Sequence, residues 1–399
     1  MAGPLFLDLS HTSHTRARTG VQRVARALDR ELSGRSTAVC FDPFEDAWRP
    51  LEAWEERNLE AAAPAPGRGS RWPLSARLRG RLRRMTGRSS RLAGPPDGSG
   101  APSGVILPEI FSAEVAGALP GLFAASSGPR VALFHDALAL QFPEFAPRST
   151  VGRFPSYLRE LLQFDGVAAV SEASRSCLLG YWAWLGVSAT PPVAAIPLGI
   201  DVPPAAPRAA PSGEVPTVLC VGSLEGRKNH LALLEACETL WAQGARFELR
   251  LVGLANAETG AQALSRIDRL RSGGRPIRYA GPADDAELEA AYRECAFTVY
   301  PSLSEGFGLP VAESLVRGRA CVCRTEGAIG EIARGGGCAS LGAAGSGEIA
   351  AAMGALLASP FDLATLEAAA LGRRFKSWAR YAAELLDWMG TLKREAGKQ

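Results

Sequence analysis

The sequence has little of what disulfide frameworks, zinc centres and membrane spans require. Its eight cysteines are scattered and none forms a Cys-x-x-Cys pair, so no zinc site is expected. Most of them lie in apolar runs, as small core residues of a reducing compartment do. No apolar run approaches the roughly 20 residues that span a bilayer, and no basic, apolar and small-residue leader opens the chain. We therefore expect a cytoplasmic protein without a secretory signal.

Length and charge limit the kind of protein further. The chain has 399 residues, 47% of them hydrophobic, which exceeds one ordinary core and predicts two globular domains. The formal net charge of +3 is small, so the overall charge does not indicate a nucleic-acid partner.

Charge is uneven in one stretch. Residues 68–91 contain nine arginines and no acid, interleaved with Trp72, Leu74, Leu78, Leu82 and Met85. Flanking Pro, Gly and Ser residues predict an irregular, partly disordered insertion over residues 45–103. A basic stretch with apolar residues at roughly helical spacing can lie on an anionic membrane, and a solvated mobile loop is the alternative. No nucleic-acid-binding fold accompanies the charge.

Elsewhere, short apolar runs alternate with helical periodicity, which predicts an α/β fold built on parallel sheets. A linker rich in Pro and Ala at residues 203–213 predicts a domain boundary, and Asp284 with Glu287 predicts a capped helix start. The expected strands are 5–9, 37–41, 104–107, 131–134, 166–170, 193–197, 218–221, 247–252, 277–280 and 297–300.

The most informative stretch runs from Tyr300 to Glu313. A short strand is followed by a loop with Gly306 and Gly308, and a helix then begins near Pro310, where a first helical turn tolerates proline. Glycines let a ligand approach the backbone, and a helix N-terminus suits a phosphate. Glu305 and Glu313 flank this turn.

Because carboxylates accept hydrogen bonds from hydroxyls, the pattern predicts a ligand with hydroxyls at both ends and phosphates between them, as in a nucleotide-sugar. A tight turn with a helix-favouring glutamate is the alternative.

Three other places in the sequence have residues that could contact a ligand. Arg227 and Lys228 end a glycine-containing loop before a helix and could bind a diphosphate; a solvated surface pair is the alternative. Gly20 lies between a strand and a helix, which makes a second turn able to bind an anion; an ordinary βα turn is the alternative. His135 follows the strand 131–134, and residues at that end of a parallel strand commonly line ligand sites; a structural histidine is the alternative.

The Glu305–Glu313 stretch resembles the two-glutamate motif of retaining GT-B glycosyltransferases of family 4, which has seven residues between the glutamates. The resemblance implies two facing Rossmann-like domains with a cleft between them. It implies that Glu305 and the backbone after it hold the donor sugar, and that Glu313 holds the ribose. The donor residues carried over from this stretch are Glu305, Gly306, Phe307, Gly308, Leu309 and Glu313.

The resemblance extends to other donor contacts. Residues 222–229 match the family's pyrophosphate loop, with Ser223 where many members carry arginine, so one phosphate contact is missing. Gly281 and Pro282 match the loop whose backbone meets the nucleobase. Gly20 matches the first-loop glycine that faces the diphosphate. The segment from Leu133 to Phe145, which contains His135, resembles a segment of O-antigen mannosyltransferases.

These matches imply a division of the chain. Residues 1–202 would form the N-terminal, acceptor-side domain, interrupted by the basic insertion at 45–103. Residues 203–372 would form the nucleotide-sugar-binding domain. Residues 373–399 would form a helix that crosses back to the N-terminal domain.

The implied reaction transfers a hexose, mannose from GDP-mannose, onto a lipid-linked bacterial surface polysaccharide at the cytoplasmic face of the inner membrane. Rhamnose and glucose donors stay open. Glu305, His135, Arg227 and Lys228 form the expected catalytic set. No cofactor or metal is expected, because no Asp-x-Asp occurs and the two cations would neutralise the leaving diphosphate.

Two other classes of protein are alternatives to a transferase. One is a catalytically silent transferase-like subunit, which the intact Glu305, Glu313, Arg227 and Lys228 argue against. The other is a dinucleotide-dependent oxidoreductase, which the missing Gly-x-Gly-x-x-Gly after a strand argues against.

Overall fold

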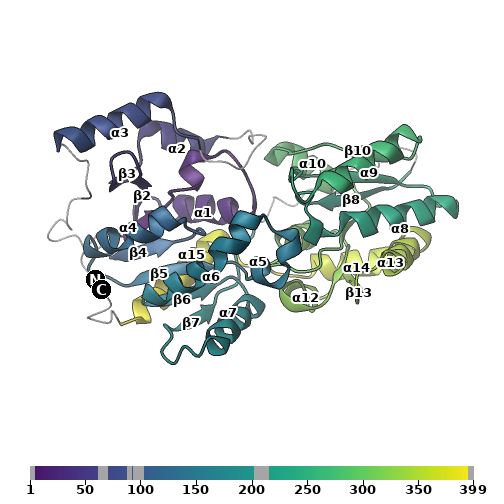
Figure 1. Cartoon of the computed structure of the whole chain (residues 1–399). Helices are drawn as coiled ribbons and strands as arrows, with labels where there is room; N and C mark the ends of the chain where they lie inside the picture. The colour runs from purple at the N-terminus through teal and green to yellow at the C-terminus, as the bar shows by residue number, and fades with distance from the viewer. Residues whose placement is uncertain (1–4, 62–70, 88–91, 93–102, 202–214, 394–399) are drawn as a thin grey trace. The chain divides into compact units, whose positions relative to one another are not determined.

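The computed structural model describes residues 5–61, 71–87, 92, 103–201 and 215–393. The chain divides into two compact units, each built on its own sheet (Figure 1). Unit 1 comprises Met1–Ala137, Gly152–Leu198 and Trp378–Gln399, and unit 2 comprises Leu138–Val151 and Gly199–Ser377. The α/β class is confirmed. The domain limits expected near residues 202 and 372 stay predictions, and the expected linker at 203–213 lies outside the described residues.

Unit 1 contains a seven-stranded sheet in the order β3-β2-β1-β4-β5-β6-β7, which is parallel except for β3. Chain order reverses on either side of β1, which pairs with both β2 and β4. A parallel sheet opens a ligand crevice at the carboxyl ends of the strands at such a point. The strands are β1 (Leu5–Asp8), β2 (Thr37–Asp42), β3 (Ala47–Pro50), β4 (Gly104–Leu107), β5 (Arg130–Phe134), β6 (Gly166–Ala169) and β7 (Val193–Ala195).

Helices connect these strands and complete unit 1. They are the 3₁₀ turns η1 (Thr12–His14) and η3 (Leu161–Gln163) and the α-helices α1 (Gly20–Glu31), α2 (Ala53–Glu60), α3 (Leu74–Thr86), α4 (Ala113–Ala124), α7 (Glu172–Trp184) and α15 (Trp378–Thr391). The chain enters unit 1 again within α6 (Arg148–Glu160), after the short α5 (Leu138–Gln141) and η2 (Pro143–Phe145) of unit 2.

The terminal helix α15 begins at Trp378 rather than at Arg373 and packs within unit 1, where it contacts α1. Two glycines at strand starts leave room for it. A Cβ added at Gly104 would lie 2.0 Å from Cε of Met389, and one at Gly166 would lie 2.8 Å from the Trp388 ring. These strand-start glycines therefore admit the large apolar side chains of the terminal helix.

Unit 2 contains a fully parallel six-stranded sheet in the order β10-β9-β8-β11-β12-β13. The strands are β8 (Thr217–Val221), β9 (Glu248–Val252), β10 (Ile277–Tyr279), β11 (Phe297–Tyr300), β12 (Cys321–Arg324) and β13 (Cys338–Leu341). The helices are η4 (Gly226–Lys228), α8 (His230–Ala242), α9 (Ala261–Ser272), α10 (Asp285–Glu294), α11 (Leu309–Val316), α12 (Gly327–Ala333), α13 (Ser346–Ala358) and α14 (Pro360–Leu371).

The local predictions agree well with this architecture. Each strand expected from the sequence is present, with ends shifted by at most two residues, while β3, β12 and β13 were not predicted. Asp284 caps α10 in a reciprocal capping box with Glu287, as expected. The cysteines Cys220 and Cys237 are buried in the unit 2 core beside leucines, as small hydrophobic residues.

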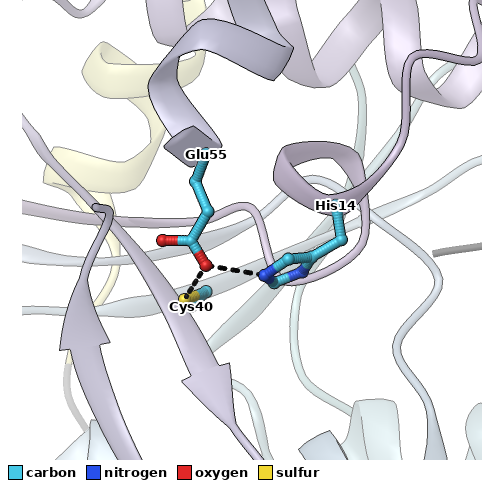
Figure 2. A group of neighbouring side chains, drawn as sticks. All are labelled: His14, Cys40 and Glu55. Carbon is cyan, nitrogen blue, oxygen red and sulfur yellow. Dashed lines mark hydrogen bonds and ion pairs between the residues drawn. The ribbon is translucent and has the colours of Figure 1, made fainter. Parts of the chain in front are cut away.

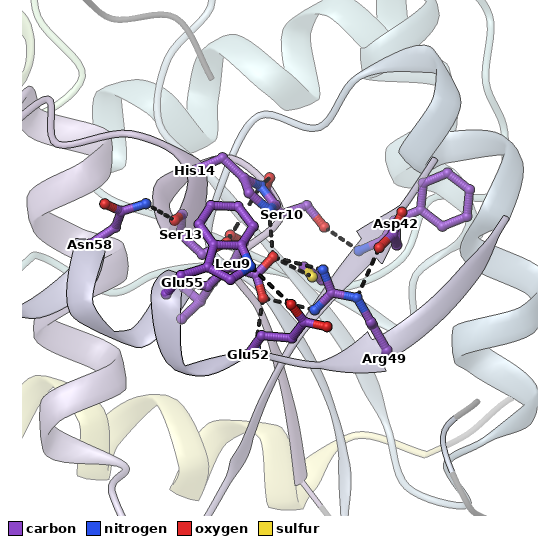
Figure 3. Close-up of polar contacts among 12 residues, drawn as sticks. Leu9, Ser10, Ser13, His14, Asp42, Arg49, Glu52, Glu55 and Asn58 are labelled. Atoms are coloured by element: carbon purple, nitrogen blue, oxygen red, sulfur yellow. Dashed lines mark hydrogen bonds and ion pairs between the residues drawn. The ribbon is translucent and has the colours of Figure 1, made fainter. Parts of the chain in front are cut away.

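The prediction of an irregular insertion at residues 45–103 is wrong for its described part, which forms β3, α2 and α3. The reason is a buried ion-pair network that hydrophobic periodicity does not report (Figure 3). The guanidinium of Arg49, 1% exposed, donates to both carboxylate oxygens of Glu55 at 2.7 and 2.8 Å and to Asp42 at 3.0 Å. The Glu55 carboxylate also accepts from the Glu52 backbone N–H at 2.6 Å.

The same carboxylate fixes η1. The His14 Nε2 lies 2.7 Å from Glu55 Oε1, and the Cys40 thiol lies 3.5 Å from that oxygen (Figure 2). The Trp72 ring stacks on the His14 ring with centroids 4.1 Å apart. Burial alone would raise the pKa of Glu55, but the hydrogen bonds from His14 and Arg49 lower it to about 2.

His14, Cys40 and Glu55 also make up a group of metal-ligand types whose candidate atoms lie within 4.8 Å of one another. The guanidinium of Arg49 already occupies both Glu55 oxygens, and burial raises the pKa of the Cys40 thiol well above its ordinary value. A cation there would have to displace another cation. The geometry therefore fits a closed ion-pair network that ties the insertion to η1.

We expect Arg49→Met to lower the free energy of unfolding by about 3–5 kcal/mol, because it leaves two buried carboxylates without their partner. Equilibrium urea unfolding followed by tryptophan fluorescence measures this change. The matched control is Arg84→Gln, which breaks a 3.1 Å pair with Asp46 whose side chains are both more than half exposed. The control should cost less than about 1 kcal/mol. Equal losses in the two variants would contradict a special role for the buried network.

Candidate active site

The stretch singled out in the sequence forms the expected strand, loop and helix. β11 is fully buried, the loop holds Glu305, and α11 begins at Leu309 with Pro310 in its first turn. Gly308 is the N-cap residue and has φ +109°, a left-handed conformation that favours glycine. A Cβ there would make only an ordinary contact with the Ile332 side chain, at 3.4 Å. The left-handed backbone conformation is therefore the reason for glycine at this helix start.

The Glu305 carboxylate is the centre of a dense polar cluster. Its Oε1 lies 2.6 Å from the Arg227 guanidinium and 2.7 Å from the Lys228 ammonium. The same oxygen accepts hydrogen bonds from the Tyr300 hydroxyl at 2.9 Å and the Ser302 hydroxyl at 2.5 Å. All of these contacts fall on Oε1, so Oε2 keeps its capacity to accept from a ligand.

The charges in this cluster are mutually dependent. Burial alone would raise the pKa of Glu305, but Arg227 and Lys228 hold it far below its usual range. Burial lowers the pKa of Lys228, and the Glu305 charge opposes that shift. Arg227 also pairs with Glu225 at 3.3 Å. Two cations and two carboxylates therefore meet with no net charge.

The loop that carries the cations is joined to neighbouring loops by side-chain hydrogen bonds. Arg227 and Lys228 end η4, and Asn229 follows in a left-handed conformation. The Asn229 side chain donates to the carbonyls of Ala344 at 2.8 Å and Pro301 at 3.4 Å. This asparagine therefore joins the η4 loop to the chain just after β11.

Tyr300 and Ser302 belong to the site but were not among the predicted site residues. The Lys228 ammonium lies 4.7 Å above the Tyr300 ring and donates to its hydroxyl. Tyr300 ends a buried apolar strand, so by sequence it looks like a core residue. A polar aromatic directly before the two-glutamate loop was the signal available for it.

The remaining predicted donor residues of unit 2 lie at the same carboxyl edge of the sheet. Gly281 follows β10 with φ +72°, and its carbonyl accepts from the Gly253 N–H at 2.8 Å. A Cβ at Gly253, which follows β9, would lie 2.0 Å from the Gly222 carbonyl oxygen. Glycine therefore lets the ends of β8, β9 and β10 pack closely at the carboxyl edge of the sheet, the edge where parallel sheets bind ligands.

Three other predicted positions differ in their surroundings. Ser223 donates to Glu225 at 2.7 Å, and Pro282 is exposed. Glu313, in α11, is 3% exposed and accepts from the Tyr292 hydroxyl at 3.2 Å rather than joining the Glu305 cluster. Glu305 and Glu313 therefore have separate polar environments.

Unit 1 contains the other two predicted site residues. His135 follows β5 and is buried, its Nε2 lies 2.7 Å from the Pro108 carbonyl oxygen, and burial lowers its pKa. A neutral ring therefore donates to that carbonyl. Gly20 is the exposed first residue of α1. Their roles toward a donor stay predictions.

Sequence reasoning missed two carboxyl groups at the switch point of the unit 1 sheet. Asp8 ends β1, and Glu109 follows β4 and accepts from the His11 backbone N–H at 3.0 Å. Burial and the charge of Glu109 raise the pKa of Asp8 to about 7. Both are single acids at strand ends with no surrounding motif, and their position at those ends was the signal available.

Among the described helices, none alone has the length and apolar composition to cross a membrane. Helices α13 and α14 meet those criteria only when joined, and the chain bends by 98° between them.

Comparison with known proteins adds family information. Residues 215–359 match the family described as glycosyl transferases group 1. The serotype-specific mannosyltransferase WbdA of Escherichia coli is 25% identical over 348 residues, which cover 83% of this chain and 40% of WbdA. The O-antigen chain mannosyltransferase B of Escherichia coli is 34% identical over 115 residues, which cover 29% of this chain and 30% of that protein. The chain thus spans less than half the length of these relatives.

Solved structures show the same fold at low identity. Anabaena HepE in complex with UDP and glucose has a TM-score of 0.68 at 16% identity, covering 98% of this chain and 100% of HepE. Sucrose-phosphate synthase from Thermosynechococcus elongatus has a TM-score of 0.66 at 16% identity, covering 97% and 98% of the two chains. The chain therefore has the fold of these solved structures, its residues 215–359 match the group 1 glycosyl transferase family, and it is similar to Escherichia coli mannosyltransferases over 83% of its length.

Proposed function

We propose that this chain transfers a hexose, mannose from GDP-mannose, with retention of configuration onto a growing, lipid-linked surface polysaccharide. The observation that carries the proposal is the Glu305 carboxylate, bound through a single oxygen by Arg227, Lys228, Tyr300 and Ser302 at the carboxyl edge of the unit 2 sheet. The second oxygen of that carboxylate is then available for a hydroxyl of the donor sugar.

Arg227 and Lys228 would act on the diphosphate of the donor. Arg227 and Lys228 would neutralise the negative charge that grows on the diphosphate as it leaves, which is the largest electrostatic demand of the reaction. Glu305 holds them in place before the donor arrives, because its Oε1 contacts both. A cluster fixed in advance needs little rearrangement during the reaction. Glu305 therefore acts on the sugar directly and on the leaving group through its partners.

The rest of the donor would follow the family resemblance. The backbone of Gly306, Phe307, Gly308 and Leu309 would lie along the sugar and phosphates at the start of α11. Glu313 would accept from the ribose hydroxyls, with Tyr292 orienting its carboxylate at 3.2 Å. Gly281 and Pro282 would meet the base.

The proposed step conserves the configuration of the sugar. The bond between the anomeric carbon and the diphosphate oxygen breaks, and the acceptor hydroxyl forms a new bond on the same face. The leaving phosphate oxygen takes the hydroxyl proton, so no separate base of the protein is required. His135 of unit 1 stays a member of the catalytic set predicted from the family resemblance.

Donor identity rests on the relatives. The matched curated proteins are mannosyltransferases, which favours a mannose donor, and the segment containing His135 resembles that group. HepE was solved with UDP and glucose, so a glucose donor is the alternative that a direct test must separate. A rhamnose donor is a further alternative. We place the reaction at the cytoplasmic face of the inner membrane, where a lipid-linked acceptor would be reached.

Slow hydrolysis of nucleotide-sugars needs no acceptor and tests the donor. We expect GDP-mannose to be consumed faster than GDP, UDP or dTDP derivatives of glucose and rhamnose, in excess EDTA as well as in buffer with magnesium. The reason for metal independence is the pair of cations at the diphosphate position. Loss of hydrolysis in EDTA, with recovery on adding manganese, would contradict metal independence. Faster hydrolysis of another nucleotide-sugar would make that sugar the proposed donor in place of mannose. Arg227→Ala with Lys228→Ala is the inactive control.

The two glutamates should differ kinetically. If Glu305 contacts the sugar near the reacting carbon, Glu305→Gln should lower turnover by about a hundredfold or more, because its contacts strengthen in the transition state. If Glu313 holds the ribose equally in both states, Glu313→Gln should mainly raise the apparent KM for the donor. Steady-state hydrolysis at varied donor concentration measures both. The opposite pattern would mean that the donor lies in the reverse direction.

Tyr300 and Tyr292, which contact Glu305 and Glu313, allow the same split between turnover and KM to be tested with smaller changes. Tyr300→Phe keeps the ring below Lys228 but removes one hydrogen bond to Glu305, so turnover should fall about tenfold with little change in KM. Tyr292→Phe removes the hydroxyl that contacts Glu313 and should act on KM instead. Unchanged kinetics for Tyr300→Phe, with the melting temperature preserved, would remove Tyr300 from the site.

A further inference from the structure

Helix α3 presents an exposed apolar stripe. Leu74, Leu78, Leu82 and Met85 are 74%, 65%, 60% and 85% exposed, and they are four of the ten large hydrophobic side chains exposed in the described chain. Their spacing of four, four and three residues places them on one face of the helix. At a rise of about 1.5 Å per residue, the stripe extends for about 16 Å along the helix axis.

The opposite face of α3 packs on unit 1. Ala76 and Gly80 are buried, and a Cβ at Gly80 would lie 2.8 Å from the Phe44 Cβ and 3.2 Å from the Glu45 backbone nitrogen. At 100° per residue, these two positions lie about 180° from the centre of the apolar stripe. The stripe therefore points away from the body of unit 1, where Figure 1 shows α3 at the margin beyond β3 and α2.

The arginines of α3 divide into two groups. Arg79, Arg83 and Arg84 pair with acids that precede the helix: Arg79 with Glu52 at 2.5 Å, Arg83 with Glu52 at 3.1 Å and with Glu45 at 3.4 Å, and Arg84 with Asp46 at 3.1 Å. These pairs fasten the packed side of the helix to unit 1. Much of the positive charge of the run is thus already neutralised by the protein.

Arg77 and Arg81 form the second group and border the apolar stripe. Their guanidinium groups lie 5.8 and 5.9 Å from the Phe44 ring, and within the described part of the chain neither makes an ion pair. Helix α3 itself contains no acidic residue. Its outer face is therefore apolar along the middle and cationic along one edge.

The other edge of the stripe adjoins a shallow groove between α2 and α3. The groove has a volume of about 410 Å³ and is lined by Trp54 and Arg57 of α2 and by Ser75 and Arg79 of α3, among others. Arg79 is paired with Glu52, which also lines the groove, so Arg57 is the guanidinium there that can bind phosphate oxygens. Tryptophan is common at the boundary between lipid headgroups and chains. The groove edge of the stripe therefore offers one arginine and one tryptophan to a phospholipid surface.

We propose that α3 lies in the plane of an anionic membrane, with Leu74, Leu78, Leu82 and Met85 among the acyl chains and Arg77 and Arg81 at the phosphates. An amphipathic helix with a basic edge binds lipid in this way. A second copy of this chain suits the face less well, because two such faces would bring arginine against arginine. The contact goes beyond the proposed transfer reaction and does not depend on it.

The proposal limits the membrane contact predicted for residues 68–91 to a smaller surface. The surface is the outer face of α3, and only part of the arginine run is available to lipid. Residues 68–70 and 88–91 of that prediction lie outside the described residues.

The test is co-sedimentation of the full chain with vesicles of phosphatidylcholine containing 30% phosphatidylglycerol, and with phosphatidylcholine alone. Leu78→Ser with Leu82→Ser should lower the partition coefficient about tenfold or more at both low and high salt. Arg77→Gln with Arg81→Gln should lower it about tenfold on anionic vesicles at low salt and have little effect at 0.5 M salt. The difference in salt response separates the apolar contribution from the electrostatic one.

Matched controls use equally exposed positions of unit 2. Phe361→Ser with Leu371→Ser removes two apolar side chains that are 80% and 71% exposed, and Arg269→Gln with Arg275→Gln removes two exposed charges. Both controls should bind vesicles as the unaltered chain does. Donor hydrolysis and the melting temperature should be unchanged in the α3 variants, which separates failure of this proposal from failure of the proposed reaction.

Two results would overturn the proposal. Equal vesicle binding by the Leu78→Ser, Leu82→Ser variant and the unaltered chain would show that α3 does not enter lipid. A concentration-dependent dimer in sedimentation equilibrium that the same variant abolishes, without vesicle binding by either, would make the stripe an interface between copies.

Discussion

The pairing of one buried carboxylate with two cations is the constraint on which the candidate site depends. Neither partner is stable there alone: burial opposes the charge of Glu305 and of Lys228, and each offsets the other's desolvation. The pair also joins the η4 loop to the loop after β11, which lie about 75 residues apart in the chain. Neutral residues at these positions would avoid the free-energy cost of burying charge. We therefore interpret the charges as groups that bind a charged ligand.

A diphosphate would change the balance of this cluster. Two cations and two carboxylates now cancel, so a donor must share Arg227 and Lys228 with Glu305 rather than find them free. In the proposed reaction, sharing would weaken donor binding but would give the cations a fixed position when charge grows on the leaving group. Such a distribution would favour the transition state over the bound substrate, which is the condition for catalysis.

The sequence predicted the parts of the structure that local patterns determine. Strands such as β8 and β11, the capping box of α10 and the loop around Glu305 follow from apolar runs, caps and glycines within a few residues. The insertion was misread because its order depends on pairs between distant residues, such as Arg83 with Glu45, 38 positions apart. Tyr300 was missed for a related reason: its ring belongs to the core and its hydroxyl to the site, and residue type alone does not separate the two.

The contacts of the insertion decide which experiment can distinguish the two hypotheses for residues 68–91, membrane contact and a solvated loop. Trp72 stacks on His14, and the Glu55 network fixes η1, which precedes the turn to Gly20. Removing the whole segment would therefore disturb unit 1 near a predicted donor contact as well as any membrane surface. A deletion that lost both binding and activity would identify neither role. Changes confined to the exposed stripe of α3 leave Trp72, the paired arginines and the ion-pair network in place, so they alone can assign a loss of membrane binding to the surface itself.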